Sequence, residues 1–500
     1  MNILEVLEGY RDSERIAMIS GNNSICYQDL WYESDRLACY IKEICNADKT
    51  PIIVYGHKHP YMLVAFLACV KSGRAYVPVD ISVPRDRVER IIDEVHPKLI
   101  LTTEPFEFYQ DYLVMNIMAD NYIVDISSTI TKDDWVAEDD IYYIIFTSGS
   151  TGIPKGVQIP YSALNYFVEW ALSLGHNVKT HKRYINQAPF SFDLSVMDLY
   201  MSLVSESCLY ALEKSVQADY RQLFQCLRES EGNVWVSTPS FADLCLAEPS
   251  FTQALLPNME LFLFCGETLT NKTAAALLER FPKAEIFNTY GPTESTVAVT
   301  EVCITDDVNA RYNPLPVGFP KPGTTIKILD GDREVADGEK GEIVIFGNTV
   351  STGYMNRSEE SSRVFFSERC GDVFTRAYRT GDKGFYQDGM LFYCGRIDLQ
   401  IKLHGYRMEI EDVEKNLLKV PDIKQAVVLP VYEDNKVKYL KAFCIYGKPI
   451  ESEFNLQKEL KRKMAEFVPD YMIPRKLKFV DEIPMTANGK VNRKQLQEEL

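Results

Sequence analysis

Apolar and polar residues follow two periods along the first 310 positions of the chain. Short apolar runs at 51–55, 75–79 and 99–101 have the length of buried strands. Between them, 61–72 and 87–95 place apolar residues at helical spacing. Strands that alternate with helices predict a parallel sheet covered on both faces. Ligands of such sheets bind beyond the carboxyl ends of the strands.

The same alternation extends to both sides of this stretch. The further predicted elements are a helix that carries Leu30, Tyr32, Leu37 and Ile41, strands at 233–237 and 261–265, and a helix over 271–281 with Asn or Thr available as its cap. The α/β pattern therefore covers most of the first 310 residues.

The pattern changes after about residue 310. Asp-Gly pairs at 330–331, 337–338 and 388–389 separate β-rich runs such as 325–328 and 342–345, which predicts antiparallel hairpins. The last hundred residues are richer in Lys and Arg and predict a separate small α+β unit.

Composition narrows the class of protein. The chain has 500 residues, 46% hydrophobic and 25% charged, and a net charge of −17, which is unlike a nucleic-acid binder. The most apolar segment, 61–70, is half the length of a membrane span, so no membrane insertion is expected. Twelve cysteines show no C-x-x-C pair or zinc spacing. With no signal peptide recognisable, we expect a reducing cytoplasm.

The stretch 144–157 joins an apolar run, six small or hydroxylated residues, a lysine and a second apolar run. This order predicts a buried strand, a flexible loop and a return into structure. Gly149, Gly152 and Gly156 let backbone N–H groups turn toward one point, and Lys155 adds a positive charge, which suits a polyphosphate. The spacing is neither Walker A nor G-x-G-x-x-G. A mobile Ser/Gly surface loop is the alternative interpretation.

Residues 147–156 resemble the phosphate loop of the adenylate-forming enzymes, the family of acyl-CoA synthetases, luciferases and amino-acid adenylation domains. Five further stretches match that family in chain order: 186–194, 288–294, 378–382, 393–409 and 484–493. The resemblance implies an α/β fold with a large N-terminal domain over 1–397, made of parallel α/β subdomains and a β-rich subdomain. A small mobile α+β domain over 398–500 would follow, with Asp398 as the hinge.

The resemblance also implies the ligand contacts, with ATP and Mg²⁺ as cofactors. Tyr290 would stack on adenine, Asn288 would meet its polar edge and Asp382 would hold the ribose hydroxyls. Thr293 would contact the α-phosphate, and Glu294 would hold Mg²⁺, a hard cation that prefers carboxylate oxygen. The full set assigned to ATP is Thr147, Ser148, Gly149, Ser150, Thr151, Gly152, Lys155, Asn288, Thr289, Tyr290, Gly291, Pro292, Thr293, Asp382, Tyr393, Cys394, Gly395, Arg396 and Lys490.

Asp193 is the candidate for substrate recognition. It stands among Phe190, Phe192 and Leu194, where a carboxylate needs a cation or N–H donors. One interpretation is that it caps a helix running toward Val204. The resemblance implies instead that it grips the α-ammonium of an amino acid, and both roles can coexist.

Four stretches look most like the subgroup that activates D-alanine: 190–200, 264–267, 295–299 and 401–408. This likeness implies that Cys265 packs against the substrate methyl group with Val297 nearby. A buried core cysteine is the alternative for Cys265. Ser205-Glu206-Ser207 departs from the subgroup, which usually has a hydroxyl residue followed by Gly-Gly there.

The implied activity is a ligase reaction in two steps. D-alanine is activated by ATP to D-alanyl-AMP, with Lys490 neutralising charge in the active site and also contacting the substrate. The D-alanyl group then passes to the phosphopantetheine thiol of a D-alanyl carrier protein, for D-alanylation of teichoic acid. The alternatives are a freestanding adenylation enzyme for another small amino acid, an acyl-CoA synthetase, which Asp193 disfavours, and a non-catalytic ATP- or carrier-binding relative.

Overall fold

A computed structural model describes residues 1–108, 112–118, 129–147, 154–176, 180–370, 373–397, 400–433, 436–485 and 491–498. The chain divides into two compact units. The first contains residues 1–81, 94–145 and 156–397, and the second contains 82–93, 146–155 and 398–500. Each unit is described by itself.

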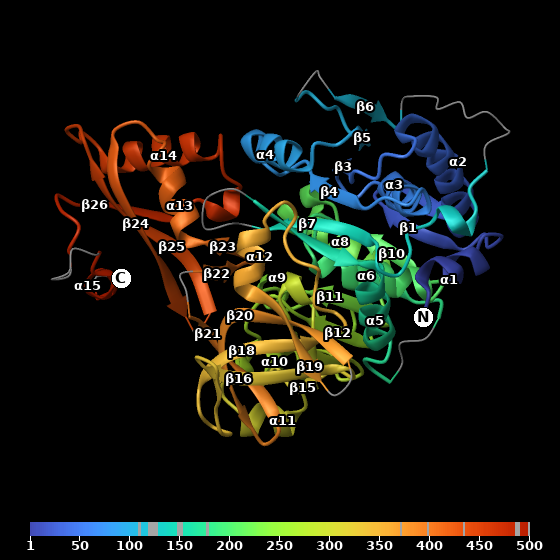
Figure 1. Ribbon diagram of the computed structural model, residues 1–500. Coiled ribbons are helices and arrows are strands. Elements are labelled where there is room, and N and C mark those ends of the chain that lie inside the picture. Colours follow the sequence, from blue (N-terminus) through green and yellow to red (C-terminus); the bar gives the residue numbers. More distant parts are fainter. Residues whose placement is uncertain are drawn as a thin grey trace. The chain divides into compact units, whose positions relative to one another are not determined.

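The first unit contains a six-stranded sheet in the order β6-β5-β3-β4-β7-β8 (Figure 1). Its strands are β3 (Ile52–Gly56), β4 (Tyr76–Asp80), β5 (Leu99–Thr102), β6 (Leu113–Asn116), β7 (Ile141–Thr147) and β8 (Lys155–Pro160). β3 pairs in parallel with β4 and β5, as does β5 with β6 and β4 with β7. The three strands predicted at 51–101 are therefore neighbours in one parallel sheet.

A nine-stranded sheet has the order β15-β14-β13-β12-β11-β9-β10-β1-β2. Its strands are β1 (Ile16–Ser20), β2 (Asn23–Cys26), β9 (Arg183–Asn186), β10 (Cys208–Ala211), β11 (Val234–Ser237), β12 (Leu261–Phe264), β13 (Glu285–Tyr290), β14 (Thr300–Cys303) and β15 (Phe319–Pro320). The strands from β13 to β1 pair in parallel, and the outer ones, β14, β15 and β2, run antiparallel. The parallel centre places the carboxyl ends of β9, β11, β12 and β13 on one edge.

Four helices supply much of the largest core cluster, together with strands of both parallel sheets. They are α2 (Tyr27–Cys45), α3 (Pro60–Lys71), α5 (Tyr161–Ala171) and α6 (Leu194–Val204). The predicted helix is present as α2, in which Leu30, Leu37 and Ile41 are buried and Tyr32 is 47% exposed. Tyr32 lies two residues from Leu30, so it falls on a different side of the helix.

The remaining helices of this unit lie at its surface or between its strands. They are α1 (Ile3–Gly9), η1 (Lys132–Asp134), α7 (Lys214–Ala218), α8 (Tyr220–Ser230), α9 (Pro239–Leu246), α10 (Asn271–Arg280), η2 (Thr293–Ser295), α11 (Asp306–Arg311) and α12 (Ser358–Val364). α10 is capped as predicted, since the Thr270 hydroxyl accepts the Thr273 N–H at 3.1 Å.

A third sheet of this unit is antiparallel. It has the order β17-β16-β18-β20-β19, with β21 pairing β20, and its strands are β16 (Thr324–Asp330), β17 (Arg333–Glu334), β18 (Gly341–Gly347), β19 (Phe365–Cys370), β20 (Val373–Gln387) and β21 (Met390–Arg396). Asp388 and Gly389 both have positive φ between β20 and β21, the backbone of a two-residue hairpin turn. The predicted β-rich region after residue 310 is this sheet.

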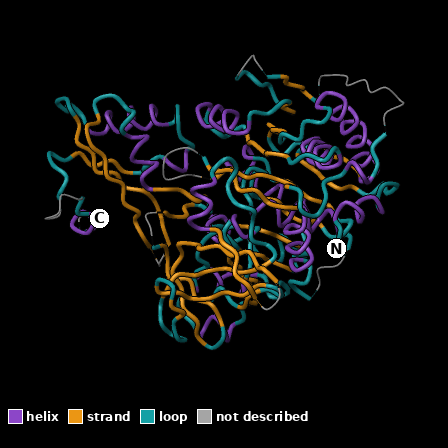
Figure 2. Tube along the Cα trace, viewed as in Figure 1, coloured by secondary structure: helices purple, strands orange, loops and turns teal. Residues whose placement is uncertain are grey.

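The second unit combines helices with two small sheets; Figure 2 colours the helices purple and the strands orange. β22 (Gln400–Leu403) pairs β23 (Tyr406–Glu409), and β24 (Ile423–Glu433), β25 (Lys436–Tyr446) and β26 (Lys476–Phe479) form the other sheet. Its helices are α13 (Ile410–Leu417), α14 (Glu453–Met464), η3 (Asp470–Met472) and α15 (Arg493–Gln497), and most of α4 (Arg85–Val95) also falls in this unit. The predicted α/β fold class is confirmed.

Among the helices of the described ranges, none has both the length and the apolar character needed to span a membrane. The cysteines at 26, 39, 45, 69, 208, 226, 245, 265, 303, 394 and 444 are free, and those at 39, 45, 69, 208, 245, 265 and 444 are buried.

Candidate active site

Three strands of the nine-stranded sheet deliver the predicted substrate and nucleotide residues to one edge. β9 ends at Asn186 and leads into the segment that carries Asp193. β12 ends directly before Cys265, and β13 ends at Tyr290, before the η2 turn. Because these strands are parallel, the three stretches leave the sheet at the same edge.

Asp193 and Thr293 meet inside this edge although they are 100 residues apart. The Thr293 hydroxyl donates to Asp193 Oδ2 at 2.6 Å, and each residue is 8% exposed. Asp193 occupies the N-cap position of α6, yet its side chain makes no capping hydrogen bond to the described residues of that helix. The carboxylate instead faces the nucleotide motif, so the capping interpretation does not account for it.

Cys265 and Val297 are also brought together. Cys265 is 3% exposed, and its Sγ lies 3.7 Å from the carbonyl oxygen of Val297. Thr296 and Val297 have φ values of +59° and +66°, and the Ala298 N–H donates to the Thr296 carbonyl at 2.8 Å. This is a γ-turn centred on a β-branched residue, a strained backbone that persists only where the surroundings impose it. Such strain often marks a ligand site.

The predicted adenine and ribose residues form a second polar cluster. The Tyr290 hydroxyl donates to Asp382 Oδ2 at 2.6 Å, and the Arg396 guanidinium donates to Asp382 Oδ1 at 2.9 Å. Burial, helped by the Asp382 charge, raises the pKa of Tyr290 well above its usual value, so the phenol stays a donor. The Tyr393 ring lies 5.8 Å from the Tyr290 ring, centroid to centroid.

The β20–β21 hairpin that carries this cluster is irregular at the site. Gly381 has a φ of +67° and Gly395 a φ of +94°. The pairing register shifts between Asp382 and Gly384, which is a β-bulge. Bulges are frequent beside active sites because they re-aim a side chain. Cys394 lies between Tyr393 and Gly395 and is half-buried.

Glu294 is 1% exposed and pairs with a residue that the motifs did not predict. The Tyr354 hydroxyl donates to Glu294 Oε1 at 2.8 Å. Tyr354 pairs with Val157, and the Met355 N–H donates to the Gly156 carbonyl at 2.8 Å. The chain leaving the predicted phosphate loop is thus tied to Glu294 through Tyr354. No sequence motif marks Tyr354.

The other residues of the 288–292 motif support the backbone of the site. Asn288 Nδ2 donates to the Pro316 carbonyl at 2.7 Å, and the Thr289 hydroxyl donates to the Phe264 carbonyl at 2.9 Å. At Gly291, a Cβ would stand 2.5 Å from Ala298 Cα and 2.7 Å from the Val297 oxygen, so only glycine fits. Pro292 is the N-cap of η2.

For several predicted residues the described parts of the chain give no contact with this arrangement. Ser148, Gly149, Ser150, Thr151, Gly152, Asp398 and Lys490 lie outside the described residues. Thr147 ends β7 and Lys155 begins β8, and both belong to the second unit. Their assigned roles stay predictions.

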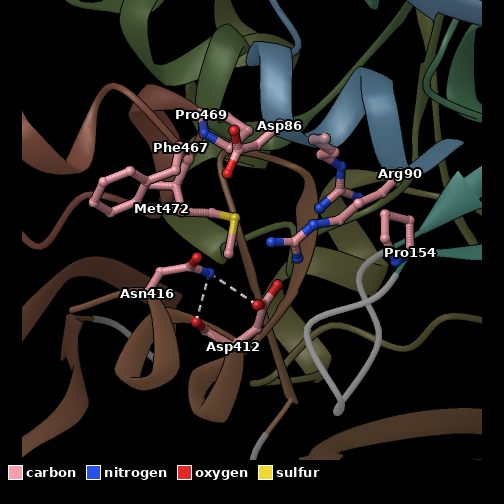
Figure 3. A pocket seen from close by; sticks show the side chains of 10 residues that line it. Asp86, Arg90, Pro154, Asp412, Asn416, Phe467, Pro469 and Met472 are labelled. Carbon is pink, nitrogen blue, oxygen red and sulfur yellow. Dashed lines mark hydrogen bonds between the residues drawn. The ribbon is translucent and has the colours of Figure 1, made fainter. Parts of the chain in front are cut away.

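A pocket within the second unit is lined by none of the predicted site residues. Its walls come from α4, α13 and the segment 467–472, with Pro154 at one side (Figure 3). Asn416 Nδ2 donates to the carbonyl of Asp412 at 2.8 Å and to its carboxylate at 2.9 Å. Burial raises the pKa of Asp412 and the charge of Arg87 opposes the rise. These groups already engage one another, so we do not assign the active site here.

Comparison with known families agrees with the geometry of the first unit. Residues 8–355 match the family described as AMP-binding enzyme, and residues 412–490 match the AMP-binding enzyme C-terminal domain. The chain therefore belongs to the AMP-binding enzymes, the adenylate-forming family predicted from the motifs.

Individual relatives indicate which AMP-binding enzymes the chain resembles in particular. The chain is 44% identical over 507 residues to the D-alanine--D-alanyl carrier protein ligase of Bacillus licheniformis, and 45% identical over 509 residues to the ligase of that name from Bacillus thuringiensis; each comparison covers 100% of both chains. These relatives confirm the resemblance to the D-alanine--D-alanyl carrier protein ligases. A Vibrio cholerae adenylation domain in complex with glycyl-adenosine-5′-phosphate has a TM-score of 0.81 over 100% of this chain and 97% of its own, at 20% identity, which shows the fold alone.

Proposed function

We propose that this ligase activates D-alanine with ATP to D-alanyl-AMP and passes the D-alanyl group to the phosphopantetheine thiol of a D-alanyl carrier protein. Full-length identity of 44–45% to ligases of that name carries the proposal. The paired Asp193 and Thr293 support it, because they bring the proposed ammonium and phosphate contacts within one hydrogen bond.

The amino acid would lie between Asp193 and the Cys265–Val297 pair. A D-alanine zwitterion has a cationic ammonium, a methyl group and a carboxylate. The Asp193 carboxylate offers charge-assisted hydrogen bonds to the ammonium. Cys265 and the strained turn at Val297 present small apolar surface to the methyl group, which limits side-chain size.

The nucleotide would lie on the other side of the Thr293 hydroxyl. Asp382 is aligned by Tyr290 and Arg396, and a carboxylate accepts two hydroxyl groups in the way that a ribose diol requires. Tyr290 and Tyr393 offer aromatic surface for adenine. Residues 147–152 with Lys155 would bind the phosphates.

Glu294 fits a magnesium ion that is shared with ATP. Mg²⁺ usually takes one or two carboxylates and completes its shell with phosphates and water. Within the described ranges no group of three or more His, Cys, Asp and Glu side chains gathers as a metal cage, and Glu294 is the carboxylate that we assign to the ion. Tyr354 orients that carboxylate at 2.8 Å. When bound, the ion supplies positive charge beside the phosphates.

The chemistry is attack of the D-alanine carboxylate oxygen on the α-phosphorus, with pyrophosphate leaving. Two anions must approach each other, so catalysis depends on positioning and on positive charge. Lys490 would supply that charge and would leave for the second step. A thiol then attacks the acyl carbon and AMP departs. Rotation about Asp398, between domains 1–397 and 398–500, would exchange the two catalytic segments. The proposed setting is the cytoplasm, for teichoic acid D-alanylation.

The experiment is loading of the purified carrier. Labelled D-alanine, ATP and Mg²⁺ are incubated with carrier protein that has or lacks its phosphopantetheine arm, and with coenzyme A. We expect a thioester on the armed carrier only, with AMP and pyrophosphate formed. Thioester on coenzyme A would favour an acyl-CoA synthetase, and loading of another amino acid would favour a peptide-biosynthesis enzyme. No AMP under any condition would mean a non-catalytic relative.

A further inference from the structure

Lys58 is a buried cation that no sequence motif marks. It follows β3 by two residues and is 1% exposed. Its ammonium donates to the carbonyl oxygens of Asn186 at 3.1 Å, Gln187 at 2.8 Å and Leu212 at 2.8 Å. An ammonium has three N–H donors, so all of its capacity goes to the backbone. Its φ of +47° is unfavourable for a lysine, which means that the surroundings hold it in place.

The three carbonyls belong to the other parallel sheet. Asn186 is the last residue of β9, and Leu212 directly follows β10. Lys58 therefore joins the carboxyl end of β3 in one sheet to two strand ends in the other. The residues it holds, Asn186 and Gln187, open the segment that runs to Asp193.

The other end of that segment is fixed as well. Asn186 Nδ2 donates to both carboxylate oxygens of Asp198 at 3.0 Å, and Asp198 lies in α6, the helix that begins directly after Asp193. Asp198 is fully buried. The position of Asp193 thus depends on a polar network that links Lys58, the backbone at 186–187 and Asp198. In the contacts described for this network, Lys58 supplies the positive charge.

Acidic groups from several elements face Lys58. Burial lowers the pKa of Lys58, and the charges of Asp198, Asp80 and Glu213 oppose the lowering and favour the ammonium form. Asp80 lies 2.7 Å from His57 Nδ1, and His57 Nε2 accepts a backbone N–H at 3.0 Å. Nδ1 is therefore the ring nitrogen that donates to Asp80.

We propose that Lys58 is a positioning residue for the amino-acid half of the active site: by fixing the backbone at 186–187, it sets where the Asp193 carboxylate stands. This inference rests on the proposed function, in which Asp193 holds the substrate ammonium. Lys58 acts through the backbone that it binds, so its loss should weaken amino-acid binding more than ATP binding.

The chain offers a matched control. Lys71 is also a fully buried lysine, and its ammonium donates to the Trp31 carbonyl, the Ser34 hydroxyl and the Asp35 carboxylate, none of which is a site residue. Lys58→Met and Lys71→Met remove the same group at equal burial. Lys58→Met leaves no carbonyl bare, because Gln217 Nε2 still donates to Gln187 and Leu212, and the Leu212 N–H still donates to Asn186.

The readout is amino-acid-dependent pyrophosphate–ATP exchange, measured with the amino acid that the wild type activates best. We expect Lys58→Met to raise the KM for that amino acid at least about tenfold with the KM for ATP within about twofold, and Lys71→Met to change neither. A wild-type preference for another amino acid contradicts the proposed function. The comparison of Lys58→Met with Lys71→Met is then made with that amino acid, so it tests the positioning role separately. Equal effects of the two variants, or equal shifts in both KM values, overturn the positioning role.

Amide hydrogen exchange gives a second readout that needs no activity. Peptides covering 186–193 should exchange faster in Lys58→Met than in wild type, while peptides covering α3 should not. If Lys58→Met does not fold, Gln217→Leu takes its place, because it removes the second donor to two of the same carbonyls; we expect a smaller rise in amino-acid KM, about threefold. Unchanged exchange at 186–193 in every folded variant contradicts the proposal.

Discussion

At the scale of single residues, the site is built from buried carboxylates that each accept a hydroxyl group. Thr293 donates to Asp193, Tyr290 to Asp382 and Tyr354 to Glu294, at 2.6, 2.6 and 2.8 Å. A carboxylate has about four lone-pair positions, so one hydrogen bond from a hydroxyl group orients it and leaves other positions to accept hydrogen bonds from a ligand. Each carboxylate is therefore aimed in advance at a different part of the proposed ligands.

Replacing Asp193 by Asn tests the first of these pairs. Asn keeps an oxygen for the Thr293 hydroxyl but loses the charge that would hold an ammonium. We expect the KM for D-alanine to rise about 30- to 100-fold, corresponding to about 2–3 kcal/mol for a charged hydrogen bond, with little change for ATP. Ser195→Ala is the control, because that hydroxyl donates only to the Phe192 carbonyl nearby. An unchanged amino-acid KM would remove Asp193 from substrate binding.

Replacing Cys265 by Gly tests which residue restricts handedness. The change opens space beside Val297, so L-alanine should be accepted more readily, and the ratio of kcat/KM for D- over L-alanine should fall about tenfold. Cys444→Gly is the matched control, since Cys444 is buried in β25 of the second unit. A constant ratio in Cys265→Gly would place the discrimination elsewhere.

The sequence predicts those residues that motifs carry, and it misses those that act through the backbone. The motifs contain Asp193, Tyr290, Glu294 and Asp382. The structure adds the hydrogen bonds that these side chains make with Thr293, Tyr354, Arg396 and one another. Lys58 could not be predicted, because its partners are backbone carbonyls 128 to 154 residues away and any residue type supplies a carbonyl.

At the scale of elements, the loops after β9, β12 and β13 decide the geometry of the site. Gly291 is a point of close approach, since the chain at 297–298 passes directly beside it. Helix and strand positions followed from periodicity, as for 61–72 and α3 (Pro60–Lys71). The sequence pattern did not predict that β14 and β15 are antiparallel strands at the edge of the sheet. Both strands are short, and their direction depends on how the chain turns back after β13 rather than on their own residues.

Gly291→Ala tests this close passage. The added Cβ would stand 2.5 Å from a backbone atom, so the 290–294 turn and the Val297 turn must separate. We expect a loss of about 1–3 kcal/mol in the free energy of unfolding, the usual range for overpacking, and a rise in the KM of both substrates. Gly9→Ala is the control, since nothing lies within 4 Å of its added Cβ. Wild-type kinetics and stability in Gly291→Ala would show that the turns can part without cost.

At the scale of the whole molecule, buried lysines link stability to pH. Burial lowers the pKa of Lys71 to about 8, against a charge–charge attraction to Asp35. Between this value and the ordinary 10.5, the unfolded chain binds more protons than the folded chain, so stability rises with pH. Relative to Lys71→Met, the wild type should gain about 2 kcal/mol from about pH 7 to about pH 9.5 in urea denaturation. A pH-independent difference would mean that Lys71 keeps its ordinary pKa.

Charge is unevenly distributed along the chain. Residues 398–500 hold 19 of the 54 Lys and Arg and 17 of the 71 Asp and Glu, which leaves 35 basic and 54 acidic residues for 1–397. Residues 398–500 therefore carry a net charge of 19 − 17 = +2 and residues 1–397 one of 35 − 54 = −19, so an acidic carrier would favour Lys and Arg side chains of residues 398–500 over the rest. We expect the KM for carrier to rise about tenfold between about 0.05 M and about 0.5 M salt, with adenylation changed less than about twofold. A salt-independent transfer step would argue against electrostatic docking.

The most direct test of the account is pyrophosphate–ATP exchange with D-alanine, L-alanine, glycine and serine as separate substrates. The account predicts that D-alanine gives the highest kcat/KM, that Asp193→Asn lowers kcat/KM for every amino acid that wild type activates, and that ATP binding survives. Strongest exchange with any other amino acid, or a kcat/KM for D-alanine that Asp193→Asn leaves unchanged, would contradict it.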